Sequence, residues 1–363
     1  MKTLLKEFSN LAREYAQNAT VYSTKSIKIG WSEIKLEDIL EKESKILKDE
    51  PALSIDRILV RLQGLNAKFS DGLYVYDSGE ETRLKDYIRR KNLRSNNKFK
   101  IIGIPTPLRT VNKTGVGILP GEVHSIFARP TVGKSWYCIK MAAIGINLGY
   151  KTLFISVEMP AEQISLRLDV VLGRIRGYDF SHKMMRGGEG LDEEEYKKFL
   201  LDIKGQKLMI CNHVNHSAIN LSGISSLVRK HKPALLIIDG IQLLSDENRK
   251  NSVWEKMQDL FNGIKTMTMS NGISALVSTQ ANRAAADIFR PPTQKDVALG
   301  DALIQASDVA MAMCRVEDEP NKARIYFQKF RDGEIPCEFV TLNFDVDKGL
   351  ISEENANSVE ANG

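Results

Sequence analysis

The chain has 363 residues, enough for one large domain of about 200 to 250 residues and a smaller one, each with its own core. Its 51 Lys and Arg residues exceed its 46 Asp and Glu residues by only 5, so the overall charge does not by itself indicate a polyanionic partner. No run of about 18 apolar residues occurs, and the first residues lack the apolar stretch of a secretion signal. This excludes a membrane-spanning class and predicts a cytoplasmic protein.

The first 86 residues predict a small, mainly helical domain. Leu4, Phe8, Leu11 and Tyr15 recur at helical spacing, and the charged stretch over residues 36–50 consists largely of helix-forming residues.

Residues 87–113 predict a basic linker. From Arg83 to Lys100 there are eight basic residues against one acid, a local surplus larger than that of the whole chain. Pro105 and Pro107 then interrupt any regular pattern.

Residues 114–351 predict an α/β domain in which a mainly parallel sheet is flanked by helices on both faces. Short apolar runs alternate with longer helical patterns, and the last runs indicate a strand meander that extends the sheet. The expected strands lie at residues 123–127, 152–157, 207–211, 234–239, 273–279, 309–315, 323–330 and 337–344, and the expected helices at 134–148, 161–175, 217–230 and 253–270. The tail over residues 352–363 has little to bury and is expected to be disordered.

A phosphate-binding loop lies between the first of these strands and the first of these helices. Backbone N–H groups of such a loop and the positive end of the helix dipole attract phosphate, Lys134 places a charge at the β- and γ-phosphates, and the Ser135 hydroxyl binds Mg²⁺. A chance match to Gly-Lys-Ser is the alternative, but the position between a strand and a helix disfavours it. The predicted nucleotide contacts are Ala128, Arg129, Pro130, Thr131, Val132, Gly133, Lys134, Ser135 and Trp136.

Asp239 is the predicted metal-shell carboxylate. It ends the apolar run over residues 234–238, where nucleotide-hydrolysing sheets hold Mg²⁺ next to the phosphate loop. A structural role as the cap of a strand is the alternative.

Glu158 ends the strand that follows the phosphate-loop helix, so it is expected to face the same crevice and to accept a proton from an attacking water. An acid that favours the start of the helix from Ala161 is the alternative, and spacing alone leaves the two nearly even.

Two further segments carry polar or basic groups at strand ends. Gln280 and Arg283 follow the strand at residues 273–279 and could bind a γ-phosphate or a nucleic acid. Lys329 and Arg331 occupy alternate positions just before a turn, and a solvated edge strand is the alternative there.

Taken together, these segments resemble the RecA-like motor domain of DnaB-type replicative helicases, the ring helicases of superfamily 4. The resemblance covers about residues 103–345, and Ala128, unusual for a general phosphate loop, is the usual residue in that family. It is carried by IPTPLRTVN, ARPTVGKS, SVEM, IDGIQLL, STQANR, FRPPTQKDVALGDALIQASD and KFRDG.

The resemblance implies ATP and Mg²⁺ as ligands and a role for each matching residue. Lys134 and Ser135 would bind phosphate and Mg²⁺, and Asp239 would complete the metal shell. Glu158 would be the catalytic base and Gln280 the γ-phosphate sensor. The resemblance makes Arg331 an arginine finger and Lys329 its companion, both acting on the nucleotide of a neighbouring subunit in a hexameric ring.

The family's loops for single-stranded DNA map to Lys295–Ile304 and to the region after Gln280. Here the chain departs from the pattern, because Ala298, Leu299, Gly300 and Asp301 replace a basic residue followed by Glu-Ser-Gly. The expected DNA contacts are Arg283, Arg290, Lys295, Gly300 and Asp301.

The function implied is an ATP-dependent replicative helicase, in a compact phage-like version that works with single-stranded DNA and with a primase or a loader. A RecA-like recombinase or annealing ATPase, or a helicase-loading factor, is the alternative. The basic segment from Arg83 to Lys100 fits either a helix that packs on the adjacent subunit or a flexible hinge.

Overall fold

The computed structural model describes residues 27–29, 32–34, 81–96, 101–212, 219–245, 253–281, 287–293 and 300–354. The chain divides into two units, residues 1–79 and residues 80–363. In the first unit, β1 (Ile27–Ile29) and β2 (Ser32–Ile34) pair antiparallel. The helices predicted near residues 4–15 and 36–50 lie outside the described residues, as do residues 355–363 of the tail that was predicted to be disordered. The prediction is wrong for the first residues of that tail, because Ser352 and Glu353 belong to a strand over residues 350–353.

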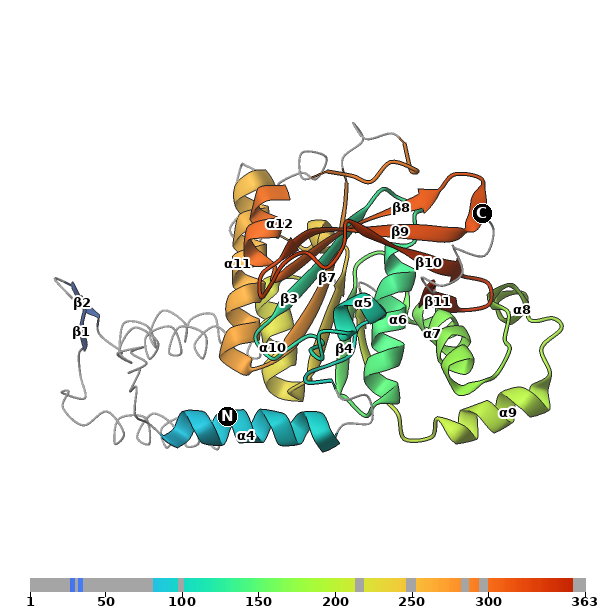
Figure 1. The fold of residues 1–363 in the computed structure, drawn as a ribbon, viewed down its shortest axis with the longest axis horizontal. Coiled ribbons are helices and arrows are strands. Elements are labelled where there is room, and N and C mark those ends of the chain that lie inside the picture. The colour runs from blue at the N-terminus through green and yellow to red at the C-terminus, as the bar shows by residue number, and fades with distance from the viewer. Residues whose placement is uncertain are drawn as a thin grey trace, which may run out of the picture. The chain divides into compact units, whose positions relative to one another are not determined.

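The second unit is built on a nine-stranded sheet (Figure 1). Its order is β11-β10-β9-β8-β3-β7-β6-β4-β5, and the six strands from β8 to β5 run parallel, while β9, β10 and β11 form the predicted antiparallel extension. The strands are β3 (Val123–Ala128), β4 (Thr152–Ser156), β5 (Leu208–Asn212), β6 (Leu235–Asp239), β7 (Ser274–Gln280), β8 (Val309–Val316), β9 (Glu319–Phe330), β10 (Phe339–Asp345) and β11 (Leu350–Glu353).

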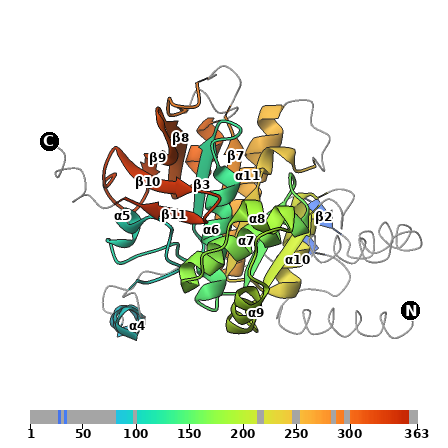
Figure 2. The ribbon, with the colours of Figure 1, turned by 90° about the vertical axis from the view of Figure 1, so that its right-hand side faces the viewer.

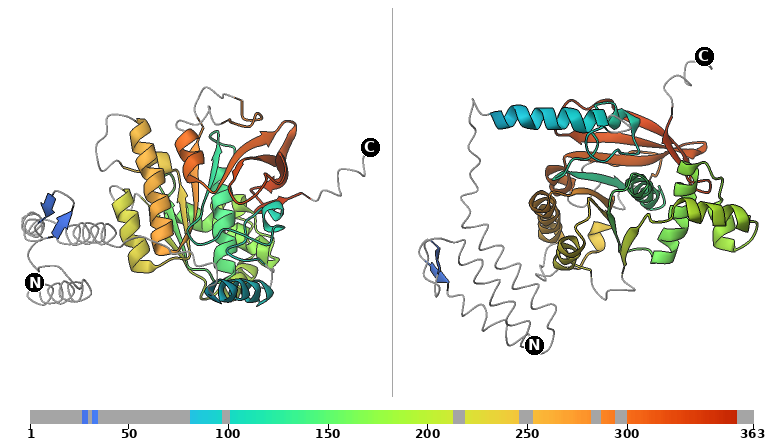
Figure 3. Two further views of the ribbon diagram at one scale, coloured as in Figure 1. Left: turned by 60° about the vertical axis from the view of Figure 1, so that its left-hand side comes forward. Right: turned by 90° about the horizontal axis from the view of Figure 1, so that it is seen from below.

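Helices cover both faces of this sheet, as predicted. Figure 1 shows α10, α11 and α12 on one side and α6 and α7 on the other, and Figure 2 shows α7, α8 and α9 facing the viewer. The left view of Figure 3 shows α10 beside α11. The helices are α4 (Glu81–Asn96), α5 (Arg109–Asn112), α6 (Lys134–Asn147), α7 (Ala161–Arg176), α8 (His182–Gly187), α9 (Glu193–Asp202), α10 (Leu221–His231), the 3₁₀ turn η1 (Ile241–Leu243), α11 (Val253–Asn271) and α12 (Gly300–Ala306).

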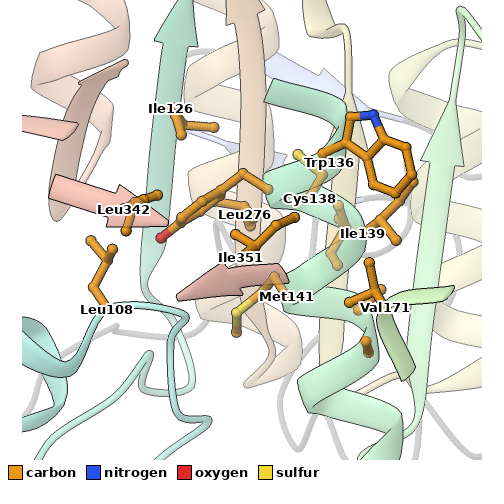
Figure 4. Packing of buried hydrophobic residues seen from close by; sticks show 14 of the residues in the cluster. Leu108, Ile126, Trp136, Cys138, Ile139, Met141, Val171, Leu276, Leu342 and Ile351 are labelled. Atoms are coloured by element: carbon orange, nitrogen blue, oxygen red, sulfur yellow. The ribbon is translucent and has the colours of Figure 1, made fainter. Parts of the chain in front are cut away.

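Each central strand contributes to two hydrophobic cores because its side chains alternate between the two faces. On β3, Ile126 packs with α6 and α7, whereas Phe127 packs with α10 and α11. Figure 4 shows the first core, in which Cys138, Ile139 and Met141 of α6 lie near Leu276 of β7. Burial on both faces explains why these strands are nearly continuous apolar runs.

Residues 101–113, the second half of the predicted linker, pack into the large unit instead. Leu108 is fully buried and Val111 is 2% exposed, and Leu108 lies near Leu342 of β10 (Figure 4). The prolines correctly marked irregular backbone, but irregular backbone can still bury apolar side chains. The first half of the predicted linker belongs to α4, which begins at Glu81, before the predicted boundary at residue 86.

Some elements have no counterpart in the sequence prediction. The short helices α8, α9 and α12 and the strand β11 were not expected, and α10 begins at Leu221 rather than at residue 217 because the Asn220 side chain accepts from Gly223 N–H at 2.9 Å. Within the described part of the chain, no helix is long and apolar enough to cross a membrane.

Candidate nucleotide site

The carboxyl ends of β3, β4, β6 and β7 meet at one edge of the sheet. In the register, Ala128 pairs with Gln280, Asp239 with Ser278, and Ser156 with Asp239. The phosphate loop follows β3, Glu158 follows β4, and Asp239 and Gln280 are the last residues of β6 and β7. The fold therefore brings together four features that are up to about 150 residues apart in the chain, at the edge where open α/β sheets bind ligands.

The phosphate loop turns through two left-handed residues. Thr131 has φ of 67° and Gly133 has φ of 122°. A positive φ is unusual for a β-branched residue, so the loop stores backbone strain at Thr131. Trp136 and Tyr137 N–H close the first turn of α6 on the Gly133 carbonyl, and the N–H groups of Lys134 and Ser135 are helix-start donors. The loop thus offers the donor geometry that binds phosphate.

Gly133 cannot be replaced without disturbing the loop. A Cβ atom at this position would lie 2.5 Å from the Phe344 ring, and the backbone conformation already disfavours any other residue. Phe344 comes from β10, on the antiparallel extension, and is 1% exposed. The antiparallel extension thus packs against the phosphate loop through Phe344.

Lys134 lies at the start of α6 and is 7% exposed. Burial lowers its pKa, while the carboxylates of Asp239 and Glu158 raise it. Because the net direction is downward, the ammonium group is held in an environment that disfavours its charge. An added anion next to Lys134 would relieve this cost.

Asp239 is 2% exposed at the end of β6. Its Oδ1 atom accepts a hydrogen bond from the Ser278 hydroxyl at 2.6 Å, and that hydroxyl accepts from Gly240 N–H at 3.0 Å. Among the described residues, no donor reaches the buried Oδ2 atom. A buried carboxylate oxygen without a partner fits a divalent cation or its bound water, so these residues suit Mg²⁺ together with the Ser135 hydroxyl.

Glu158 is exposed and held by two amide groups. Gln280 Nε2 donates to Glu158 Oε1 at 2.8 Å, and Gln242 Nε2 lies 3.5 Å from the same oxygen. The predicted base and the predicted sensor are therefore in direct contact. The φ of Gly240, 91°, favours glycine, and a Cβ atom at this position would lie 3.3 Å from Glu158 Oε1.

Gln242 was not singled out from the sequence. Its Oε1 atom accepts from the Thr279 hydroxyl at 3.1 Å, which turns its amide nitrogen toward Glu158. The signal available in the sequence was its position three residues after Asp239, at the same sheet edge. A polar residue there is common enough that spacing alone does not select it.

The first residues of the phosphate loop contact the end of β7. Ala128 is fully buried and pairs with Gln280, and Arg129 donates to the Ala281 carbonyl at 3.3 Å. Pro130 is exposed and Val132 is buried.

Trp136 points into the core rather than out of the loop. It is 8% exposed, and the Arg167 guanidinium of α7 lies 5.0 Å from the centre of its ring. The His182 ring packs edge-on against it at 5.1 Å.

Lys329 and Arg331 lie at the opposite edge of the sheet, where the parallel strands β3 and β8 begin. Phe330, between them, pairs with Val309 at the beginning of β8, which neighbours the beginning of β3. The phosphate loop follows the other end of β3, a strand of six residues. At about 3.3 Å per residue, the two ends are some 20 Å apart. The structure therefore does not bring these cations to the phosphate loop of their own chain.

Both cations have partners at that edge. Lys329 Nζ donates to the Ile304 and Gln305 carbonyls at the end of α12, at 2.7 and 3.1 Å, and Arg331 binds Asp308 at 2.8 Å. Lys329 belongs to β9, which is an interior strand of the sheet because it lies between β8 and β10. It is therefore not on the solvated edge strand that was the alternative.

The predicted DNA contacts are described only in part. Arg290 is exposed, and Gly300 and Asp301 open α12, whereas Arg283 and Lys295 lie outside the described residues.

Comparison with known proteins identifies the family. The sequence model for the DnaB-like helicase C terminal domain matches residues 103–350, more than half of the chain. The chain belongs to this family. The DnaB-like match begins eleven residues before the predicted domain boundary at residue 114, in agreement with the burial of Leu108 and Val111.

Two relatives are named as replicative helicases. A probable plasmid replicative DNA helicase of Chlamydia muridarum (strain MoPn / Nigg) is 30% identical over 310 residues, 80% of this chain and 66% of that protein. The replicative DNA helicase DnaB of Pasteurella multocida (strain Pm70) is 22% identical over 253 residues, 65% of this chain and 52% of that protein. The chain thus spans about half to two thirds of the length of these relatives.

Solved structures share the fold. One solved ATPase domain superposes with a TM-score of 0.64 at 18% identity, covering 77% of this chain and all of that chain. A structure described as that of a DnaB-like replicative helicase and its interactions with primase superposes with a TM-score of 0.66 at 17% identity, covering 88% of this chain and 75% of that chain. The prediction of a RecA-like sheet is confirmed.

Proposed function

We propose that this protein is an ATP-driven DNA helicase that works as a ring, translocating on single-stranded DNA. The observation that carries the proposal is the division of the predicted catalytic groups between opposite edges of one sheet. Family membership and the names of its relatives support the same function.

In this proposal the phosphate loop, Lys134 and Ser135 bind the triphosphate of ATP. Asp239 and Ser135 hold Mg²⁺, which neutralises phosphate charge when it is bound. Glu158 accepts a proton from the attacking water, and Gln280 contacts the γ-phosphate. The 2.8 Å hydrogen bond from Gln280 to Glu158 supports this pairing. If Gln280 donates to the γ-phosphate when ATP is bound, it no longer donates to Glu158, and the Glu158 carboxylate becomes available to accept a proton.

A neighbouring copy completes the site. Arg331 and Lys329 lie about one strand length from the phosphate loop of their own chain, so we assign them to the nucleotide bound by the next subunit. An arginine finger supplied in trans is worth about 10³ to 10⁵ in rate in well-studied nucleotide hydrolases. A heterologous interface of this kind generates a ring when the rotation between neighbours closes; we propose a closed ring of six copies.

Helix α4 is a candidate for a second contact between copies. Leu84, Tyr87 and Leu93 are all more than half exposed on it, among basic residues. We propose that this helix packs on the neighbouring subunit. Arg283, Arg290, Lys295, Gly300 and Asp301 are the proposed contacts to single-stranded DNA, and a primase or a loader is the proposed protein partner.

Unwinding of a forked duplex with ATP and Mg²⁺ tests the function. The wild type is expected to separate the strands, whereas Glu158→Gln is expected to bind ATP and DNA but to lose unwinding, because no group accepts the proton of the attacking water. Glu162→Gln, at an exposed position on α7, is the matched control and is expected to unwind like the wild type.

A wild type that coats single strands and promotes their pairing, without unwinding, would instead make the protein a recombinase or annealing ATPase. ATP-dependent release of another helicase onto DNA, again without unwinding, would make it a loading factor.

A further inference from the structure

Asp308 accepts four hydrogen bonds at the edge of the sheet that carries Arg331. It is 5% exposed and immediately precedes β8. Its Oδ1 atom accepts from Arg331 Nη1 at 2.8 Å, and its Oδ2 atom accepts from Lys265 Nζ at 2.6 Å and from Val123 N–H at 2.8 Å. The Arg331 backbone N–H also donates to the Asp308 carbonyl at 2.8 Å.

The two carboxylate oxygens of Asp308 have different tasks. Oδ2 is fixed to α11 through Lys265 and to β3 through Val123, and Asp308 N–H donates to the Val123 carbonyl at 2.8 Å. This side of the carboxylate is tied to the strand that leads to the phosphate loop. Among the described residues, Oδ1 accepts a hydrogen bond from the Arg331 guanidinium only. A carboxylate immobilised on one side can therefore orient an arginine on the other.

Among the described residues, the Arg331 guanidinium is held through Nη1 alone. Its side chain is 51% exposed, while that of Asp308 is 6% exposed. A guanidinium has five N–H donors in a rigid fork, so a bond through Nη1 leaves donors on its other nitrogens available to a second anion. An arginine that is anchored but half exposed is suited to reach outward without searching many rotamers.

We propose that Asp308 is a positioning residue for Arg331, which sets the direction of the guanidinium toward the nucleotide of the next subunit. The inference rests on the proposed action of Arg331 in trans. Asp308 touches neither nucleotide; it acts by restricting Arg331 before the neighbour docks, so that less conformational entropy is lost when the site closes.

The charge of Asp308 supports this role. Burial raises its pKa, but hydrogen bonds from Lys265, Val123 and Arg331 outweigh burial, and the net pKa lies below the usual value for an aspartate. The carboxylate thus remains an anion near neutral pH.

Asparagine is the informative substitution at this position. Its single side-chain oxygen can accept from Val123 N–H and Lys265, which places its NH₂ group against Arg331, donor to donor. Asp308→Asn therefore keeps the contacts to β3 and α11 and removes the one to Arg331.

Mixed rings separate positioning from folding. A Lys134→Ala subunit keeps Arg331 but cannot hydrolyse ATP at its own site, whereas an Arg331→Ala subunit keeps its site but supplies no arginine finger. A mixture of the two therefore hydrolyses ATP only where a Lys134→Ala subunit supplies Arg331 to the site of an Arg331→Ala neighbour. The rate of this hydrolysis is the restored rate. Asp308→Asn is then added to one type at a time. In the Lys134→Ala subunit it is expected to lower the restored rate by about 10- to 100-fold, the cost of misplacing a catalytic group by about 1 Å. In the Arg331→Ala subunit it is expected to leave the restored rate within about twofold, because that subunit supplies no finger.

Equal losses in the two arrangements would overturn the proposal, because a role in folding alone affects either subunit alike. No loss in either arrangement would also overturn it. If the parent mixture restores no hydrolysis at any ratio, the action of Arg331 in trans is wrong and the role of Asp308 falls with it. Glu334→Gln, an exposed acid in the turn after Arg331, is the matched control and is expected to change neither arrangement.

Discussion

Asp239 and Ser278 form one side of the proposed cation site at the ends of β6 and β7. The Ser278 hydroxyl fixes Oδ1 of Asp239, and at the same time satisfies Gly240 N–H, which leaves Oδ2 as the open ligand. Groups that orient a metal ligand are worth about 10- to 100-fold in metal affinity or activity. Ser278 should therefore matter although it touches no nucleotide.

Ser278→Ala is expected to raise the Mg²⁺ concentration at half-maximal ATP hydrolysis by about tenfold, because Asp239 loses the bond that orients it. A titration of hydrolysis against Mg²⁺ at saturating ATP measures this. Ser165→Ala, which removes an exposed hydroxyl bonded within α7, is the control. An unchanged Mg²⁺ curve for Ser278→Ala would show that Asp239 does not depend on Ser278.

At the scale of elements, the segment before β3 belongs to the core of the large unit. Leu108 is fully buried, and Ile104 and Ile118 are at most 3% exposed around it. Ile104 and Ile118 also exchange backbone hydrogen bonds at 3.0 and 2.9 Å. A solvated linker would bury none of these side chains.

Leu108→Ala is expected to lower the free energy of unfolding of the large unit by about 2 to 5 kcal/mol, the usual cost of a cavity at a buried leucine. Leu201→Ala is the matched control, because Leu201 on α9 is 69% exposed, and its expected cost is within about 0.5 kcal/mol. Denaturant unfolding of both variants measures the difference. Equal free energies of unfolding for Leu108→Ala and Leu201→Ala would contradict this packing and would assign residues 101–113 to the linker.

The elements that the sequence predicted best are those whose local pattern is complete. The run over residues 234–238 is apolar throughout because β6 is buried on both faces, and the loop before Lys134 carries its own signature. Contacts between distant residues leave no such pattern. Asp308 meets Val123 from 185 positions away, and Phe344 meets Gly133 from the last part of the sheet. Gln242 and Asp308 were therefore found only in the structure.

At the scale of the whole molecule, we propose that hydrolysis is a property of assembled copies. One chain holds the phosphate loop, Asp239 and Glu158 at one edge of its sheet and Arg331 at the other. A single copy would bind ATP with its own loop but would lack the positive charge that stabilises the transferring phosphoryl group.

The most direct test of this claim is the rate of ATP hydrolysis per subunit across a dilution series, with the assembly state of each sample measured by light scattering. Saturating Mg²⁺, ATP and single-stranded DNA are kept constant. As rings dissociate, the rate per subunit is expected to fall by about 10³-fold or more, the contribution of a missing arginine finger. A monomer that hydrolyses ATP as fast as the ring would contradict the account.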